Sequence, residues 1–87
     1  MLVSYTIEFA KAAVKELSAL DRILAIRIKA AIEALAENPT PIGCKMLKGS
    51  SQAYRIRVGD YRIIYSIEHG RLLILVLKIG HRREVYR

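Results

Sequence analysis

The spacing of hydrophobic residues changes along the chain, and each change predicts a different element. Leu2–Ile7 is short and rich in β-branched and aromatic residues, which predicts a first strand. From about Phe9 to Leu20, apolar residues recur near the helical period. Asp21 can cap a second helix, whose apolar stripe continues to Leu35 at i, i+4, i+7 spacing. A helical hairpin is therefore expected after the first strand.

The second helix is expected to end at Asn38, because Pro39 disfavours helical geometry in the residue before it. After a loop, the period changes to two. Alternating apolar residues over Ala53–Val58 and Tyr61–Ile67 predict two strands. The dipeptide Gly59-Asp60 between them is typical of a two-residue hairpin turn.

A third strand of this meander is expected at Arg71–Ile79, after a turn at Glu68–Gly70. This segment is apolar at almost every position, which is typical of a central strand covered on both faces. The order β-α-α-β-β-β predicts an α+β fold, with the helical hairpin packed on one face of a small antiparallel sheet. At 87 residues and 53% hydrophobic content, one domain over 1–87 can form its own core.

The two-residue loop also predicts which residues of the hairpin face each other. One face is expected to pack on the helices, and it carries Tyr54, Ile56, Val58, Tyr61, Ile63 and Tyr65. The other face carries Arg55, Arg57 and Arg62, with Arg57 directly opposite Arg62. Opposed like charges destabilise a sheet, so the cluster suggests an anion bound between them. Phosphate fits because guanidinium matches it bidentately. The alternative is a solvated polar face balanced by carboxylates.

Charge is distributed unevenly along the chain. The formal net charge is +7, and the first half is balanced. From Lys45 onward, ten Lys and Arg face three Asp and Glu. An excess of this kind favours a polyanionic partner such as nucleic acid, an anionic membrane surface or an acidic protein segment. A generic solubilising surface is the alternative, but its charges would be scattered more evenly.

Several classes of protein are excluded or disfavoured. The longest apolar run, Leu72–Leu77, is far below the roughly 20 residues that span a bilayer, and the N-terminus does not resemble a signal segment. A cytoplasmic protein without a membrane partner is expected. Cys44 is the single cysteine, which excludes an internal disulfide. Neither a metal nor another cofactor is expected, because no carboxylate cluster has metal-ligand spacing.

The last predicted strand continues into a cationic tail, residues 80–87. Gly80 permits a sharp change of direction, after which His81, Arg82 and Tyr86 can converge on the arginine face. Lys78, just before the tail, and Arg83, within it, add further positive charge. For His81, a hydrogen-bonded surface imidazole is the alternative to a catalytic or RNA-contacting role.

Three segments, in this order, resemble the RelE toxins of bacterial type II toxin–antitoxin modules. They are Lys45–Gly49, Tyr54–Tyr65 and Leu75–Tyr86, and the resemblance covers essentially the whole chain. It implies the RelE-like fold and a ribosome-dependent endoribonuclease that cuts messenger RNA in the ribosomal A site. It also implies a RelB-like cognate antitoxin that neutralises the toxin, with the ribosome and mRNA as the other partners.

The resemblance also implies site residues. Position by position, the family's functional cations match Arg55, Arg57, Arg62 and Arg82, and its tyrosine matches Tyr86. The type members carry lysines at the first two positions. An arginine stays protonated in proteins, so Arg55 and Arg57 are expected to stabilise charge and not to transfer protons.

Metal-independent RNA cleavage requires three events: deprotonation of the 2′-OH, stabilisation of the phosphorane charge and protonation of the leaving oxygen. We expect Arg62 and Arg82 to bind the scissile phosphate, and either Tyr86 or His81 to move the proton. Substrate-binding support is expected from Arg55, Arg57, Lys78 and Arg83. Two other functions remain open: a ParE-like inhibitor of DNA gyrase and a non-catalytic RNA-binding module.

Overall fold

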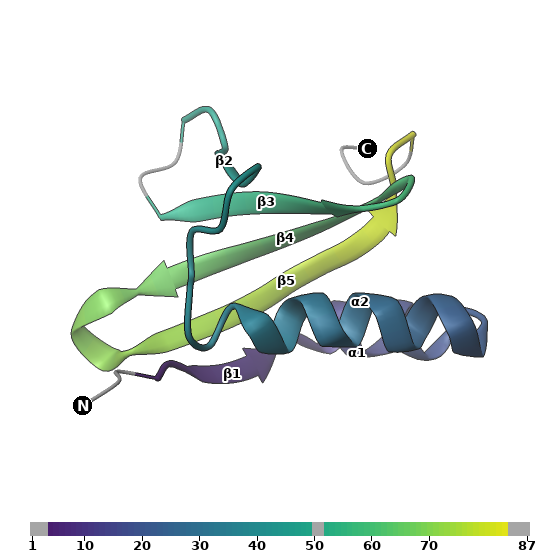
Figure 1. Cartoon of the computed structure of the whole chain (residues 1–87), viewed down its shortest axis with the longest axis horizontal. Coiled ribbons are helices and arrows are strands. Elements are labelled where there is room, and N and C mark those ends of the chain that lie inside the picture. Colours follow the sequence, from purple (N-terminus) through teal and green to yellow (C-terminus); the bar gives the residue numbers. More distant parts are fainter. Residues whose placement is uncertain (1–3, 50–51, 84–87) are drawn as a thin grey trace.

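The computed structural model describes residues 4–49 and 52–83, and it has the expected α+β architecture: helices packed on one face of a sheet (Figure 1). The sheet has the strand order β1-β5-β4-β3-β2. The strands are β1 Thr6–Phe9, β2 Lys45–Met46, β3 Ala53–Val58, β4 Tyr61–Glu68 and β5 Leu73–His81. The helices are α1 Lys11–Ser18 and α2 Arg22–Ala34, with the short 3₁₀-helix η1 at His69–Arg71.

The sheet is mixed, so the expectation of a purely antiparallel sheet is wrong in one respect. The first strand, β1, pairs parallel with β5, from Thr6 opposite Leu73 to Phe9 opposite Val76. It also lies later in the sequence than the predicted Leu2–Ile7, of which residues 2 and 3 fall outside the described residues. The parallel pairing explains why the strand lies later than predicted, because its bounds are set by the residues that hydrogen-bond to β5. A short fifth strand, β2, adds an antiparallel partner to β3.

The helical hairpin forms where the periodicity predicts it. Asp21 caps α2 as expected: its Oδ1 accepts the backbone N–H of Leu24 at 3.0 Å. The helix ends at Ala34 and not at Asn38, so the predicted end is four residues too late. The residues after Ala34 form tighter i→i+3 hydrogen bonds, beginning with the N–H of Leu35 to the carbonyl of Ile32 at 3.0 Å, as is common in the last turn before a proline.

The β3–β4 hairpin has the predicted register. Val58 faces Tyr61 and Arg57 faces Arg62, and the pairing continues to Ala53. Gly59 has φ +59°, the left-handed conformation that a type II′ turn requires at its first central position.

The connection from β4 to β5 differs from the predicted tight turn. It is the 3₁₀-helix η1 followed by Leu72 at φ +49°, so β5 begins at Leu73, two residues later than expected. The ion pair of Arg71 with Glu68, at 3.0 Å, lies at this connection.

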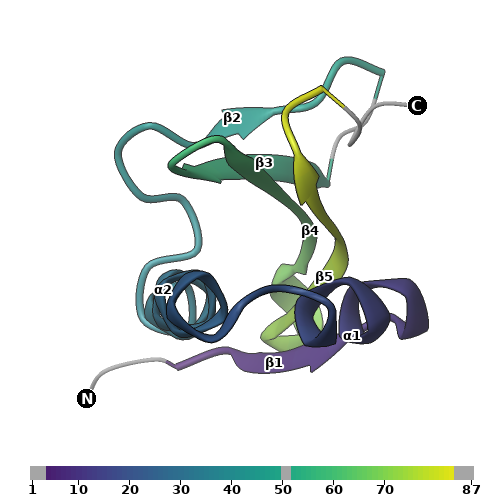
Figure 2. The ribbon, with the colours of Figure 1, turned by 90° about the vertical axis from the view of Figure 1, so that its right-hand side faces the viewer.

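The core lies between the sheet and the helices. Its buried members come from α1, α2 and the residue that follows α2, and from β3, β4 and β5. They are Ala13, Ile28, Ile32, Leu35, Ile56, Ile63, Tyr65, Ile67, Ile74, Val76 and Ile79. Both helices lie next to each other on the same side of the twisted sheet (Figure 2). The strand β5 is internal as predicted, but the helices cover one face only, and Leu75 and Leu77 remain partly exposed.

Candidate functional site

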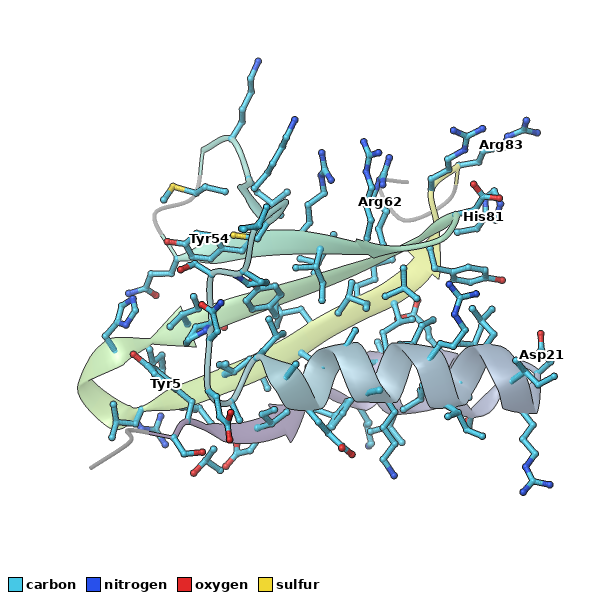
Figure 3. All side chains as sticks on the ribbon, in the orientation of Figure 1. Tyr5, Asp21, Tyr54, Arg62, His81 and Arg83 are labelled. Atoms are coloured by element: carbon cyan, nitrogen blue, oxygen red, sulfur yellow. The ribbon has the colours of Figure 1, made fainter. Side chains whose placement is uncertain are left out.

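Three arginines share the sheet face that points away from the helices. The register places Arg57 directly opposite Arg62, and Arg55 lies two residues before Arg57 on the same face. Their neighbours Ile56 and Ile63, on the other face, are 7% and 0% exposed. Figure 3 shows Arg62 extending away from the helices. The face predicted from the sequence therefore exists, and the alternation of the two strands creates it.

A lysine that the sequence analysis did not assign extends this face. Lys45 of β2 pairs with Arg55 of β3. Together with Ile42, Gly43 and Arg57, these two residues line a pocket of about 340 Å³. A two-residue strand has no periodicity to detect, so the one signal available was the position of Lys45 in a segment that resembles the RelE toxins.

Two of the three arginines of this face, Arg55 and Arg57, lack a carboxylate partner in the part of the chain that the structure describes. The Nη1 atom of Arg55 is buried and has no hydrogen-bond partner within residues 4–49 and 52–83. An unpaired buried donor of a charged group is costly, and an anion would relieve that cost. This arrangement favours a bound anion over a self-balanced polar surface.

The start of the tail continues the sheet and does not turn at Gly80. Gly80 pairs with Arg62, and the N–H of Arg82 donates to the carbonyl of Asp60 at 2.8 Å. The expected change of direction at Gly80 is therefore wrong, because its backbone belongs to the β5 ladder. Arg82 and Arg83 follow and are exposed.

The imidazole of His81 lies with Tyr61 and not with Arg62. His81 pairs with Tyr61, and the two rings meet edge to face at 5.6 Å and 80°. Alternation along β4 places Tyr61 and Arg62 on opposite faces at the start of this strand. Figure 3 shows His81 and Arg62 towards the same end of the sheet. The Nδ1 atom of His81 accepts the N–H of Arg83 at 3.3 Å, which favours the tautomer with its proton on Nε2.

Two other sequence-predicted residues have different outcomes. Lys78 pairs with Ile64, two residues after Arg62, so the register places it on the arginine face. Tyr86 lies outside the described residues, and its role stays a prediction.

Within residues 4–49 and 52–83, no group of three or more His, Cys, Asp or Glu side chains is arranged to hold a metal ion. Over the same ranges, no helix has the length and apolar character needed to cross a membrane.

Comparison with known proteins identifies the family. The model of the ParE toxin of type II toxin–antitoxin systems, parDE, matches residues 7–86. The chain therefore belongs to this family of type II toxins. Within it, the chain is a RelE-type toxin, as its individual relatives indicate.

The relatives match over nearly their whole length. The chain is 32% identical over 88 residues to the protein named toxin RelE1 of Methanocaldococcus jannaschii, with 98% of each chain covered. It is 30% identical over 84 residues to the toxin RelG of Mycobacterium tuberculosis, with 95% of this chain and 97% of the other covered. Among solved structures, the RelE–RelB complex from Pyrococcus horikoshii matches with a TM-score of 0.82 and 30% identity, over 94% of this chain and 99% of the other.

Proposed function

We propose that this toxin is a ribosome-dependent, metal-independent mRNA endonuclease that inhibits translation. The observation that carries the proposal is the pairing of Arg57 with Arg62 beside Gly80, at the end of the sheet where the cationic tail begins. Cleavage would proceed by attack of a 2′-OH on the adjacent phosphorus. The RelE-type relatives support this function.

The cations supply the electrostatic part of the mechanism. Arg62 and Arg82 bind the scissile phosphate and stabilise the charge that develops on the phosphorane. A second group of cations binds the RNA backbone on either side of the scissile phosphate. Its members are Arg55, Arg57, Lys78 and Arg83. Lys45 joins this second group, because it pairs with Arg55 on the same face.

The proton transfers fall to the tail. In its favoured tautomer, His81 presents an N–H at Nε2, which can donate a hydrogen bond to the RNA. Tyr86 is the candidate base for the 2′-OH. An ordinary tyrosine has a pKa near 10, and a nearby cation such as a tail arginine would favour its ionised form. A site with so few titrating groups depends on the ribosome to orient the message.

A protein antitoxin is the proposed partner. The solved structures similar to this chain include RelE–RelB complexes from Pyrococcus horikoshii and Methanococcus jannaschii. Exposed cations on this chain lie beside partly exposed apolar residues, a combination that suits an acidic amphipathic segment.

The test is cleavage of a message bound to ribosomes, followed by analysis of the new ends. We expect 5′-hydroxyl and 2′,3′-cyclic phosphate ends, a loss of about 100-fold or more in Arg62→Ala, and losses in Tyr86→Phe and His81→Ala. Arg27→Ala, an exposed cation on α2, is the matched control and should cleave normally. Recovery of 3′-hydroxyl and 5′-phosphate ends would refute the chemistry, and efficient cleavage of free RNA would refute the ribosome dependence.

A second candidate function is inhibition of DNA gyrase, because the matching family model is named for ParE. Induction of the chain in cells discriminates the two. The nuclease stops protein synthesis first, whereas a gyrase inhibitor first blocks DNA supercoiling and replication. Purified gyrase assayed with the chain gives the same answer without cells.

A further inference from the structure

A second pocket lies at the same end of the sheet as Arg62, between the end of α1 and the strands β4 and β5. Its volume is about 450 Å³, and Glu16, Ala19, Leu20, Tyr61, Lys78 and His81 are among the residues that line it. The pair Tyr61–His81 is one register step from the pair Arg62–Gly80. A step along a strand is about 3.3 Å, so the pocket and Arg62 lie at the same end of the sheet, on its two faces.

A carboxylate is fixed in the wall of this pocket. Oε1 of Glu16 accepts the backbone N–H of Ile79 at 2.9 Å, across 63 residues of sequence. Strand β1 covers the edge of β5 only as far as Val76, so Glu16 satisfies a donor that no neighbouring strand reaches. Glu16 is partly buried and forms no ion pair within residues 4–49 and 52–83. Its second oxygen therefore keeps its capacity to accept hydrogen bonds.

Flat rings line the same pocket. Tyr61 and His81 meet edge to face at 5.6 Å, and both are partly exposed. Proteins that recognise single-stranded RNA stack splayed bases on such rings and read the base edges with polar side chains. Aromatic rings and an acceptor-only carboxylate at one pocket give the chemistry for a nucleobase.

We propose that this pocket binds one base of the RNA strand whose phosphate lies on the arginine face. The inference rests on the proposed function. Glu16 gives the pocket its preference: a carboxylate only accepts hydrogen bonds, so it favours bases with an exocyclic amino group over uracil. Uracil places carbonyl oxygens on both sides of its one N–H, and these repel a carboxylate. Adenine, cytosine and guanine each have an amino group to donate.

The first test measures binding without cleavage. The purified chain is titrated with AMP, CMP, GMP and UMP, and amide chemical shifts are followed by NMR. We expect UMP to bind about tenfold more weakly than the other three, with the largest shifts near Tyr61 and His81. In Glu16→Gln, the amide oxygen still accepts the N–H of Ile79, whereas its NH₂ group can donate to uracil. The discrimination should therefore fall to less than about twofold.

Two further variants keep the result interpretable. Glu33→Gln makes the same change at an exposed site on α2 and should leave the discrimination unchanged. Ala19→Phe fills the pocket from an exposed position and should weaken all four nucleotides, whether or not Glu16→Gln folds normally. The proposal would be overturned if wild type bound the four nucleotides equally, or if Ala19→Phe bound them as tightly as wild type does.

The second test uses ribosome-bound message and maps every cleavage position. Glu16→Gln should raise the fraction of cleavage events that fall at codons containing uracil. An unchanged distribution would contradict the base-binding role. If wild type does not cleave at all, the proposed nuclease function fails, and the nucleotide titrations still decide whether the pocket binds a base.

Discussion

The opposed arginines of the β3–β4 hairpin predict a gain in stability together with a loss of activity when one is removed. Arg57 is exposed, faces Arg62 and has no ion pair in the described part of the chain. Antiparallel pairs alternate in type, and the pair next to a two-residue loop exchanges hydrogen bonds. Arg57 and Arg62 therefore form the non-hydrogen-bonded kind, in which side chains are closest. Arg57→Gln removes this repulsion and keeps part of the alkyl stem.

The expected size follows from the cross-strand interaction. Such pairs contribute roughly 0.2–1 kcal/mol, so Arg57→Gln should raise the free energy of unfolding by up to about 1 kcal/mol at low salt. For a domain of this length, that corresponds to a rise in Tm of up to about 4–8 °C. In 1 M salt the Debye length is about 3 Å, and most of the gain should disappear.

Urea unfolding at low and high salt measures the stability, and cleavage of ribosome-bound message measures the activity. Arg27→Gln removes the same charge from an exposed site on α2 and serves as the control for net charge. We expect a gain in stability and a loss of cleavage in Arg57→Gln alone. The reasoning from opposed charges would be refuted if Arg57→Gln were less stable than wild type at low salt. It would also be refuted if Arg27→Gln gained as much stability as Arg57→Gln.

Three further substitutions test the scaffold that holds the site. Asp21→Ala removes the cap of α2 and should cost about 1 kcal/mol in urea unfolding, whereas Asp21→Asn should cost much less. Gly59→Ala forces a side chain into φ +59° and should cost about 1–2 kcal/mol, with cleavage reduced because the turn aligns the two arginines. Tyr65→Phe removes a 2.6 Å hydrogen bond to the carbonyl of Pro39 and should cost about 1–3 kcal/mol at pH 7. Burial raises the pKa of the Tyr65 hydroxyl above its usual value. The neutral hydroxyl therefore contributes its full share of folding stability below about pH 10, and this share is lost as the pH rises further. The difference in stability between wild type and Tyr65→Phe should narrow over that range.

Local patterns were sufficient for much of the site. A two-residue loop and strict alternation specified that Arg57 faces Arg62, because the side-chain period of a strand leaves no freedom once the turn is known. The cap at Asp21 was predictable for the same reason, since a cap involves residues only three apart. The end of α2 was not, because Pro39 limits the helix without specifying which residue is its last.

Contacts between distant segments needed the tertiary structure. The sequence of β1 predicts a strand but not its parallel pairing with β5, and Lys45 reaches the arginine face only through its pairing with Arg55. Neither pairing leaves a periodic signal in either partner.

The sequence by itself determined the arginine face and the cationic tail, since both follow from short-range spacing. Only the tertiary structure decided that His81 lies with Tyr61, on the opposite side from Arg62, and that Glu16 reaches the backbone of Ile79. The physical reason is that these contacts join residues 20 and 63 positions apart. Their geometry depends on how β4 pairs with β5 and on how α1 packs on the sheet, which no local pattern contains.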